Sequence, residues 1–327
     1  MEVVLGKPRG FCAGVVRAIE IVETALELYG APVYVYHEIV HNQHVVRELQ
    51  KRGAVFIEAL DAIEPGSVLV FSAHGVSRQI VAEARQRGLE VIDATCPLVS
   101  KVHLEVARFA RLGHEVILIG HAGHPEVNGT LGQYNSRNGG AIYLVQTIEE
   151  AGLLEVVNPE NLAVVTQTTL SVDDTARIMA VLRQRFPKIV EPHKDDICYA
   201  TQNRQIAVRR MASDLDVLFV VGSRNSSNSN RLREVGEQMG VDAYLVQDAD
   251  DIQPAWIQPS CQRIGVTAGA SAPEVLVRGV IDRLCELGVE QVEELDAADE
   301  LTSFRLPPVL VKQIEEKAAG DSLGRFL

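Results

Sequence analysis

The sequence predicts an α/β protein built from parallel sheets, and three observations support this prediction. Apolar, β-branched runs such as "PVYVYHEI", "EVILIGHAG" and "DVLFVVGS" are typical of buried strands. Segments with helical periodicity separate such runs, among them 76–87, 99–112, 172–186, 202–212 and 273–287. The regular alternation of the two patterns is typical of parallel strands joined by helical crossovers.

The composition limits the class of protein. The chain has 327 residues, of which 46% are apolar, so it can bury a large core. No apolar run reaches the roughly 18 residues that span a bilayer, and "MEVVLGKPRG" lacks the pattern of a signal peptide, so we expect a soluble, cytoplasmic protein without a membrane partner. A net charge of −13 argues against general nucleic-acid binding. Five widely spaced cysteines favour a reducing compartment and a metal or redox role.

A long-period repeat organises the chain. Cys12, Cys96 and Cys198 each precede a helix that leads to an apolar strand with a polar tip. These first tips carry His41, His124 and Ser226, which lie 29, 28 and 28 residues after the respective cysteines. A second strand in each repeat ends in its own polar tip, and the second tips carry His74, Thr168 and Ser271.

The repeat predicts three similar parallel-sheet α/β units in a pseudo-threefold arrangement around a central cluster. We expect the first unit over 14–96, the second over 97–193 and the third over 194–290. The N-terminal strand within 1–13 is expected to join the third unit, because the series restarts at Cys12. Residues 291–327 form a C-terminal tail in this scheme.

The three cysteines in register predict a metal site. Ligands of parallel sheets lie beyond the carboxyl ends of the strands, so the polar tips and the thiols are expected to converge. Structural zinc usually takes four protein ligands, often from C-x-x-C pairs, whereas three cysteines on an iron-sulfur cluster leave one iron open. An open iron is a Lewis acid as well as an electron donor. Cys261 and Cys285 fall outside the register and are predicted to be packing residues.

The polar tips predict an anion site. Helix N-termini with Ser, Thr, Asn and His offer N–H and O–H donors of the kind that hold phosphate, with His41, His74 and His124 as the charge partners. No nucleotide-binding glycine motif is present. Glu126 is the carboxylate within a tip and is a candidate proton donor with a raised pKa, and Thr168 is a candidate relay for that proton.

Nine ordered motifs resemble those of the 4-hydroxy-3-methylbut-2-enyl diphosphate reductase family. They are "GFCAGVVRAIE", "HEIVHN", "SAHGVS", "DATCPLVSKVH", "GHAGHPEVNGTLGQ", "TQTTLSVDDT", "DDICYATQNRQ", "GSRNSSNSNRL" and "GVTAGASAPE". The match runs from about Gly6 to about Glu274, and the tail from about Val289 carries no comparable motif.

The resemblance implies a cofactor, a substrate and a reaction. It implies a 4Fe-4S cluster on Cys12, Cys96 and Cys198, with Glu126 and Thr168 beside the allylic hydroxyl of the substrate. The diphosphate partners that it implies are His41, His74, His124, Ser226, Ser227, Asn228 and Ser271. The implied reaction is the two-electron, two-proton reductive dehydroxylation that ends the methylerythritol phosphate pathway and yields isopentenyl and dimethylallyl diphosphates.

The electrons are expected from a ferredoxin or a flavodoxin. Such carriers are generally acidic and so is this chain, so docking needs a local basic patch. Lys7 and Arg9, beside the Cys12 loop, are the sequence-based candidates. Two other functions use the same residue types: a zinc-dependent hydrolase of a phosphorylated metabolite, and a non-catalytic iron-sulfur sensor, which does not need Glu126.

Overall fold

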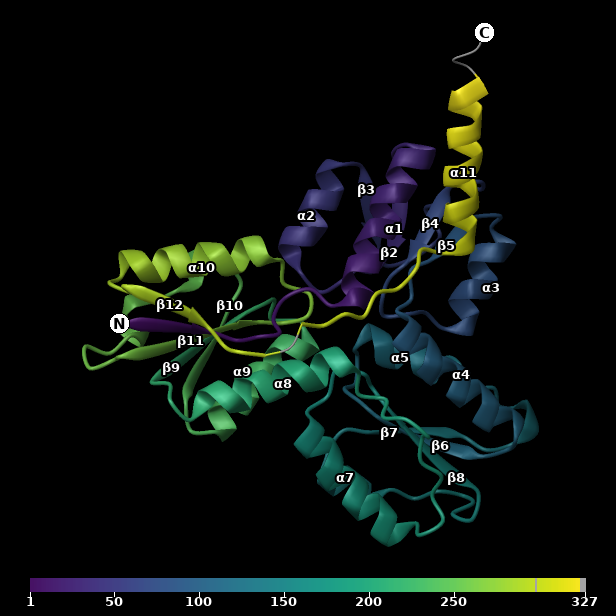
Figure 1. Cartoon of the computed structure of the whole chain (residues 1–327). Coiled ribbons are helices and arrows are strands. Elements are labelled where there is room, and N and C mark those ends of the chain that lie inside the picture. The colour runs from purple at the N-terminus through teal and green to yellow at the C-terminus, as the bar shows by residue number, and fades with distance from the viewer. Residues whose placement is uncertain (298, 324–327) are drawn as a thin grey trace. The chain divides into compact units, whose positions relative to one another are not determined.

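The computed structural model describes residues 1–297 and 299–323, and these form two compact units (Figure 1). Unit 1 comprises Met1–Cys12, Glu115–His121 and Tyr143–Thr302. Unit 2 comprises Ala13–His114, Ala122–Ile142 and the described residues from Ser303 onward. Each unit is built from parallel strands with helices between them.

Unit 2 contains one four-stranded sheet in the order β3-β2-β4-β5, with every pair parallel. Its strands are β2 (Val33–Tyr36), β3 (Ala54–Ile57), β4 (Val68–Phe71) and β5 (Glu90–Asp93). Its helices are α1 (Ala13–Tyr29), α2 (Gln43–Lys51), α3 (Arg78–Gln86), α4 (Pro97–Arg111), α5 (Pro125–Leu131), the short η1 (Ser136–Asn138) and α11 (Pro308–Leu323).

Unit 1 contains two sheets, in the orders β7-β6-β8 and β10-β9-β11-β1-β12. The strands are β1 (Glu2–Leu5), β6 (Glu115–Ile119), β7 (Ile142–Val145), β8 (Leu162–Thr166), β9 (Val217–Val221), β10 (Asp242–Val246), β11 (Arg263–Ala268) and β12 (Gln291–Glu294). The helices are α6 (Ile148–Leu153), α7 (Val172–Arg185), α8 (Tyr199–Ala212), α9 (Ser227–Gln238), η2 (Ala249–Asp251), η3 (Pro254–Trp256) and α10 (Glu274–Glu286).

The three sheets share one strand order, which confirms the predicted α/β class with parallel sheets. In each sheet the strand that ends in the first polar tip lies between a short edge strand and the strand that ends in the second tip. The edge strands β3, β7 and β10 were not predicted individually. The N-terminal strand β1 pairs in parallel with β11 and β12, so it lies in the sheet of the last third of the chain. The unit boundaries derived from the repeat remain a prediction.

Polar residues start most of the helices that follow the strands. A side chain accepts a backbone N–H of the first turn at the N-caps Asn42, Ser77, His124, Thr147, Ser171 and Ser226. Such bonds satisfy donors that a helix start leaves unpaired. Cys96 and Cys198 are also N-caps, but their thiols make no capping bond.

The cores explain why the strands read as continuous apolar runs. Every residue of β4, β6, β8 and β9 is buried, as expected for strands covered on both faces.

Cys261 is 4% exposed and packs in the core of the five-stranded sheet, as predicted, whereas Cys285 is exposed on α10, so its prediction as a packing residue is wrong. Within the described part of the chain, no helix has the length and apolarity to cross a membrane.

Candidate active site

Each of the three cysteines of the repeat, Cys12, Cys96 and Cys198, makes an equivalent backbone hydrogen bond. In each case the cysteine N–H donates to a carbonyl oxygen in a second polar tip, and the pairs are Cys12 with Ala270 at 3.3 Å, Cys96 with Ala73 at 3.0 Å and Cys198 with Thr168 at 3.0 Å. The repeat found in the sequence is therefore also a repeat of local geometry. Each bond ties a cysteine loop to a predicted substrate-binding loop of the same unit.

The donor chemistry of these cysteines fits a metal cluster. All three are partly exposed thiols outside disulfide bonds, and neither Cys96 nor Cys198 uses its sulfur as a helix cap. Thiolates are the ligands that iron-sulfur clusters take. Among residues 1–297 and 299–323, no three His, Cys, Asp or Glu side chains lie close enough together to hold a metal ion. Cys96 lies in unit 2, and Cys12 and Cys198 lie in unit 1.

Unit 2 brings together the three histidines that were predicted to bind the diphosphate. The rings of His41 and His74 stack with centroids 4.1 Å apart, and the ring of His124 meets them edge-on at 5.2 and 5.7 Å. His41 precedes the start of α2, His74 follows β4, and His124 is the N-cap of α5. Three imidazoles at the carboxyl ends of strands form a compact group suited to an anion.

Hydrogen bonds orient two of these rings. The Nδ1 atom of His124 accepts the backbone N–H of Glu126 at 3.1 Å, so the proton of the neutral ring lies on Nε2. The Nδ1 atom of His41 lies 3.1 Å from a carboxylate oxygen of Glu38, to which it can donate. His124 therefore presents an N–H donor from the nitrogen opposite its cap bond.

The pKa of His74 is lowered well below its usual value. Desolvation is the main cause, and the neighbouring rings of His41 and His124 add to it. In the free protein this ring is therefore neutral near pH 7. A bound diphosphate would oppose both causes, because its negative charge favours the imidazolium form.

Glu126 is buried in unit 2, at 3% exposure, on a helix that packs tightly against the His74 turn. A Cβ atom on Gly129 would lie 2.9 Å from the carbonyl oxygen of Gly75, so glycine permits this approach. The amide of Gln133 donates to the carbonyl oxygen of Val76 at 2.7 Å and so ties the end of α5 to the same turn. These contacts couple the positions of Glu126 and His74. Sequence reasoning missed Gln133, although it lies within the quoted motif "GHPEVNGTLGQ".

Arg17 holds the loop that carries Cys96. Its guanidinium donates to the carbonyl oxygens of Ala94 at 3.4 Å and Thr95 at 3.0 Å. Burial lowers the pKa of Arg17, and the nearby Asp93 and Cys96 partly offset this effect. A cation beside Cys96 favours its thiolate, the form that binds metal.

Unit 1 gathers the predicted hydroxyl and amide donors. Ser226 Oγ lies 3.5 Å from Ser271 Oγ and caps α9. Asn228 accepts the backbone N–H of Ala270 at 2.9 Å, and Ser227 Oγ donates to the carbonyl oxygen of Thr169 at 3.1 Å. The side chains come from the ends of β9 and β11, and the contact with Thr169 ties them to the loop after β8.

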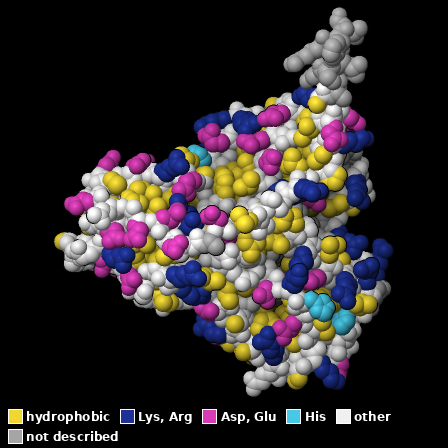
Figure 2. Space-filling model, in the orientation of Figure 1, with side chains coloured by type: hydrophobic (Ala, Val, Ile, Leu, Met, Phe, Trp, Pro, Cys, Tyr) yellow, Lys and Arg dark blue, Asp and Glu magenta, His cyan; other side chains and the backbone are white. Residues whose placement is uncertain are grey.

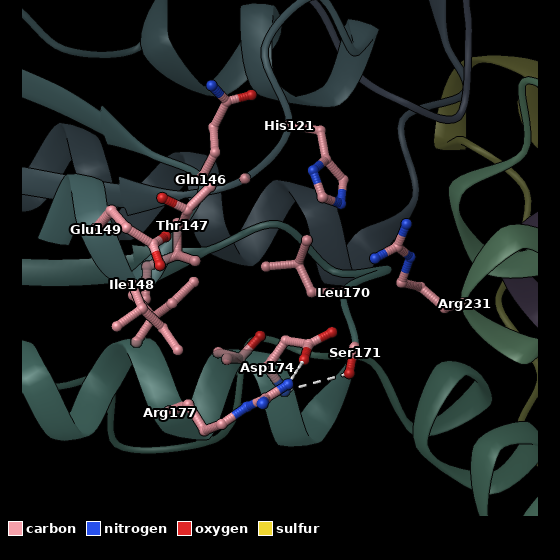
Figure 3. Close-up of a pocket in the computed structure, with 14 residues that line it drawn as sticks. His121, Gln146, Thr147, Ile148, Glu149, Leu170, Ser171, Asp174, Arg177 and Arg231 are labelled. Atoms are coloured by element: carbon pink, nitrogen blue, oxygen red, sulfur yellow. Dashed lines mark hydrogen bonds and ion pairs between the residues drawn. The ribbon is translucent and has the colours of Figure 1, made fainter. Parts of the chain in front are cut away.

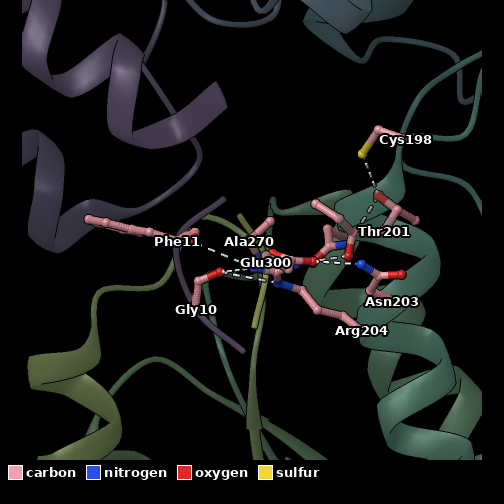
Figure 4. Close-up of polar contacts among 10 residues, drawn as sticks. Gly10, Phe11, Cys198, Thr201, Asn203, Arg204, Ala270 and Glu300 are labelled. Atoms are coloured by element: carbon pink, nitrogen blue, oxygen red, sulfur yellow. Dashed lines mark hydrogen bonds and ion pairs between the residues drawn. The ribbon is translucent and has the colours of Figure 1, made fainter. Parts of the chain in front are cut away.

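A hydrogen-bonded path joins this donor group to Cys198. Asn228 Nδ2 donates to Thr201 Oγ1 at 3.3 Å, and Thr201 Oγ1 lies 3.2 Å from the sulfur of Cys198 (Figure 4). Thr168 is 4% exposed, and its carbonyl oxygen accepts the N–H of Cys198. Unit 1 therefore brings Cys198 close to Thr168 and Asn228, with Thr201 as a link that sequence reasoning missed, and the roles of these residues stay predictions.

The fully buried Arg204 supports the loop before Cys12 (Figure 4). Its guanidinium donates to the carbonyl oxygen of Gly10 at 2.7 and 3.1 Å, and its Nη1 lies 3.1 Å from both carboxylate oxygens of Glu300. Arg204 lies on α8, whose N-cap is Cys198, so it links two cysteine loops. Glu300 belongs to the tail to which no function was assigned from the sequence.

Lys7 and Arg9 are ion-paired within unit 1. Lys7 contacts Asp299 at 3.0 Å and Glu294 at 3.6 Å, and Arg9 contacts Glu294 at 2.6 Å and Glu274 at 2.8 Å. Two cations therefore face three carboxylates. This region lacks the excess positive charge that the docking prediction for Lys7 and Arg9 requires.

A separate cavity of about 250 Å³ in unit 1 lies beyond the ends of β6 and β7 (Figure 3). Arg177 pairs there with Asp174, and Arg231 pairs with Glu234. Burial and the charge of Arg231 lower the pKa of His121, so it adds no positive charge near neutral pH. None of the predicted site residues lines this cavity, and its paired charges do not suit a diphosphate.

Comparisons with known proteins agree with the motif series. The LytB protein family model matches residues 3–285. The 4-hydroxy-3-methylbut-2-enyl diphosphate reductase of Pseudomonas entomophila is 60% identical over 310 residues, which cover 95% of this chain and 98% of the relative, and a Pseudomonas putida enzyme of the same name is equally similar. A solved Plasmodium falciparum structure named as E-1-hydroxy-2-methyl-but-2-enyl-4-diphosphate reductase superposes with a TM-score of 0.92 at 37% identity and covers 97% of this chain and 99% of its own. The chain therefore belongs to the LytB protein family.

Proposed function

We propose that this protein reduces 4-hydroxy-3-methylbut-2-enyl diphosphate to isopentenyl and dimethylallyl diphosphates, the last step of the methylerythritol phosphate pathway. The reaction consumes two electrons and two protons, breaks the allylic C–O bond, forms a C–H bond and releases water. Family membership over most of the chain supports the activity. The observation that carries it is the group of three imidazoles beside the buried carboxyl of Glu126.

The diphosphate binds to His41, His74 and His124 and to the donors of unit 1. The Nε2–H of His124 donates to a phosphate oxygen, and a proton taken up by His74 adds positive charge on binding. Ser226, Ser227, Asn228 and Ser271 supply hydroxyl and amide donors at the N-terminus of α9, where the helix dipole also favours an anion. The hydroxyl and amide donors are neutral and cannot balance the negative charge of the diphosphate. Protonated imidazoles supply the positive charge that does.

The cofactor is a 4Fe-4S cluster held by Cys12, Cys96 and Cys198, with one iron left open. The partial exposure of the three thiols and the equivalent backbone hydrogen bond at each cysteine support this assignment. When bound, the cluster supplies single electrons and a Lewis-acidic iron. Arg204 and Arg17 hold the loops that carry Cys12 and Cys96 through hydrogen bonds to the carbonyl oxygens of Gly10 and Thr95.

Glu126 and Thr168 handle the protons. Glu126 is buried, follows the His124 cap and carries the carboxyl that can deliver a proton to the leaving hydroxyl. Thr168 is buried and lies in the loop that contacts Cys198, so its hydroxyl is suited to relay that proton. An acidic carrier such as a ferredoxin or a flavodoxin delivers the electrons, in the cytoplasm.

One anaerobic experiment tests the proposal. Purified protein is assayed for iron, acid-labile sulfide and visible absorbance, and then for turnover of the hydroxymethylbutenyl diphosphate with a chemical reductant. We expect about four iron and four sulfide per chain, as in a 4Fe-4S cluster, and both diphosphate products. Zinc in place of iron, or hydrolysis of the diphosphate, would favour the hydrolase, and a cluster without turnover would favour the sensor. The comparisons support neither of these two functions.

A further inference from the structure

A groove of about 650 Å³ opens in unit 2 next to Cys96. Thr95 and Pro97, the two neighbours of Cys96, are among its lining residues, as are the carboxylates of Asp93 and Glu105. One face of α4 contributes a wall through Lys101, Leu104 and Arg108, and Pro308 at the start of α11 also lines the groove. The groove therefore reaches from the surface to the residues that flank a proposed cluster ligand.

The centre of this α4 wall is apolar and open to solvent. Leu104 is 71% exposed, so this apolar side chain is accessible to a partner. Lys101 and Arg108 lie three residues before it and four residues after it, so the three side chains share one helix face. An apolar centre with charged residues around it is the common composition of a transient protein interface.

The charge of α4 differs in sign from the charge of the chain. The chain carries −13, whereas the helix sequence "PLVSKVHLEVARFAR" has three cations and the single carboxylate of Glu105. Figure 2 shows Lys and Arg side chains gathered where α4 lies in Figure 1. Lys101 lies 3.9 Å from Glu105, and the two side chains are only 29% and 20% exposed, so Glu105 offsets part of this charge, whereas Arg108 stays exposed. The wall thus keeps the positive excess that Lys7 and Arg9 lack.

We propose that this groove is the docking surface for a small, acidic, one-electron carrier protein. The inference rests on the proposed function, which requires an external source of two electrons. Each encounter oxidises one reduced carrier by one electron, so two encounters supply the electrons for one C–O cleavage. Basic side chains steer the acidic carrier, and Leu104 packs against its apolar surface. Electron transfer becomes faster at short range, and this groove ends beside Cys96.

The test uses the cluster-loaded protein and the charge-reversed double variant Lys101→Glu with Arg108→Glu. Turnover is measured with dithionite and with a reduced plant-type ferredoxin at several salt concentrations, and binding of oxidised ferredoxin is measured by calorimetry. We expect turnover with dithionite to stay unchanged. At low salt the rate constant with ferredoxin should fall about 10-fold or more, ferredoxin should bind more weakly, and the rate with ferredoxin should depend less on salt concentration. The neutral pair Lys101→Gln with Arg108→Gln should fall in between.

Arg47→Glu is the matched control. Arg47 is exposed on α2, which precedes the edge strand β3, whereas α4 follows β5 at the opposite edge of the sheet. This control should leave ferredoxin binding and turnover close to those of the unchanged protein. Leu104→Ala should weaken ferredoxin binding without changing its salt dependence.

Three results would overturn the docking site. The first is ferredoxin kinetics and binding in the double variant equal to those of the unchanged protein. The second is an equal loss with dithionite, which would assign these residues to folding or catalysis. The third is a dimer that the double variant abolishes, which would assign the groove to a second copy of this chain. Failure of the unchanged protein to turn over with dithionite would instead contradict the proposed function.

Discussion

The backbone N–H of Cys198 donates a hydrogen bond of 3.0 Å to the carbonyl oxygen of Thr168. This bond joins a proposed cluster ligand to a proposed proton relay through the main chain, so substitution of either side chain leaves the connection in place. Cys12 and Cys96 make the equivalent bond with Ala270 and Ala73. A change in iron content or turnover in a side-chain variant at these positions therefore reports the chemistry of the side chain, because the backbone bond that holds the loop persists.

Replacement of one register cysteine by serine should remove most of the bound iron. Serine keeps the size and the backbone bond of Cys12, Cys96 or Cys198 but lacks the thiolate that iron-sulfur clusters use. Cys261→Ser and Cys285→Ser are the controls and should keep both iron and activity. Iron and sulfide analysis with visible absorbance provides the measurement, and a loss in Cys261→Ser as large as in Cys96→Ser would contradict the register.

Glu126→Gln should fold, keep its cluster and bind substrate, but lose turnover by about 100-fold or more, as expected for a lost general acid. Glutamine keeps the shape of the side chain and removes the transferable proton. His124→Ala should also raise the Michaelis constant, because it removes a diphosphate contact and the cap of α5. Anaerobic kinetics with a chemical reductant separate the two effects, and near-normal turnover of Glu126→Gln would disprove the proton-donor role.

Glu300→Gln should destabilise the protein by about 3 kcal/mol or more, since it leaves the buried charge of Arg204 without its partner. We also expect lower iron loading, because Arg204 holds the Gly10 carbonyl before Cys12. Glu294→Gln is the control: its carboxylate pairs with Arg9 at 45% exposure, and such pairs contribute about 1 kcal/mol or less. Denaturant unfolding and iron analysis test both expectations, and equal effects of the two variants would refute them.

The free energy of unfolding should fall as the pH drops from 7 to 5, partly because of His103. Burial lowers the pKa of this α4 histidine from 6.5 to about 4, and its ring lies against Gly75. Below pH 6.5 the unfolded chain binds a proton that the folded chain does not, so stability rises with pH across this window. The contribution between pH 6.5 and 5 is about 2 kcal/mol at most.

His103→Gln removes this titration, so its unfolding free energy should change less between pH 7 and pH 5 than that of the unchanged protein. Denaturant unfolding at the two pH values gives the comparison. His193→Gln is the control, because His193 is exposed in the segment between α7 and α8. Identical pH dependence in the unchanged protein and in His103→Gln would show that His103 does not titrate as inferred.

The parts of the site that follow from local pattern were predictable. His124 and Ser226 cap helices directly after strands, and such positions combine turn chemistry with strand periodicity. Cys12, Cys96 and Cys198 were singled out by their regular spacing, and their role as ligands stays a prediction.

The unpredicted parts depend on contacts between distant segments. Arg204 and Glu300 are 96 residues apart, and no local pattern indicates that a helix arginine is fully buried or which carboxylate meets it. The carboxylates that neutralise Arg9 are likewise remote, at 274 and 294. The strands β3, β7 and β10 have four or five residues each and lie at sheet edges, where the apolar signal is weak.

The position of β1 has a consequence for synthesis of the chain. β1 precedes every other described strand in the chain, yet it lies between β11 and β12, the two that come last in chain order among the described strands. During synthesis Glu2–Leu5 has no strand partner until β11 (Arg263–Ala268) has been made, and its second partner follows only with Gln291–Glu294. The backbone of the Cys12 loop follows β1 directly, so its final position depends on pairing with two strands made more than 250 residues later.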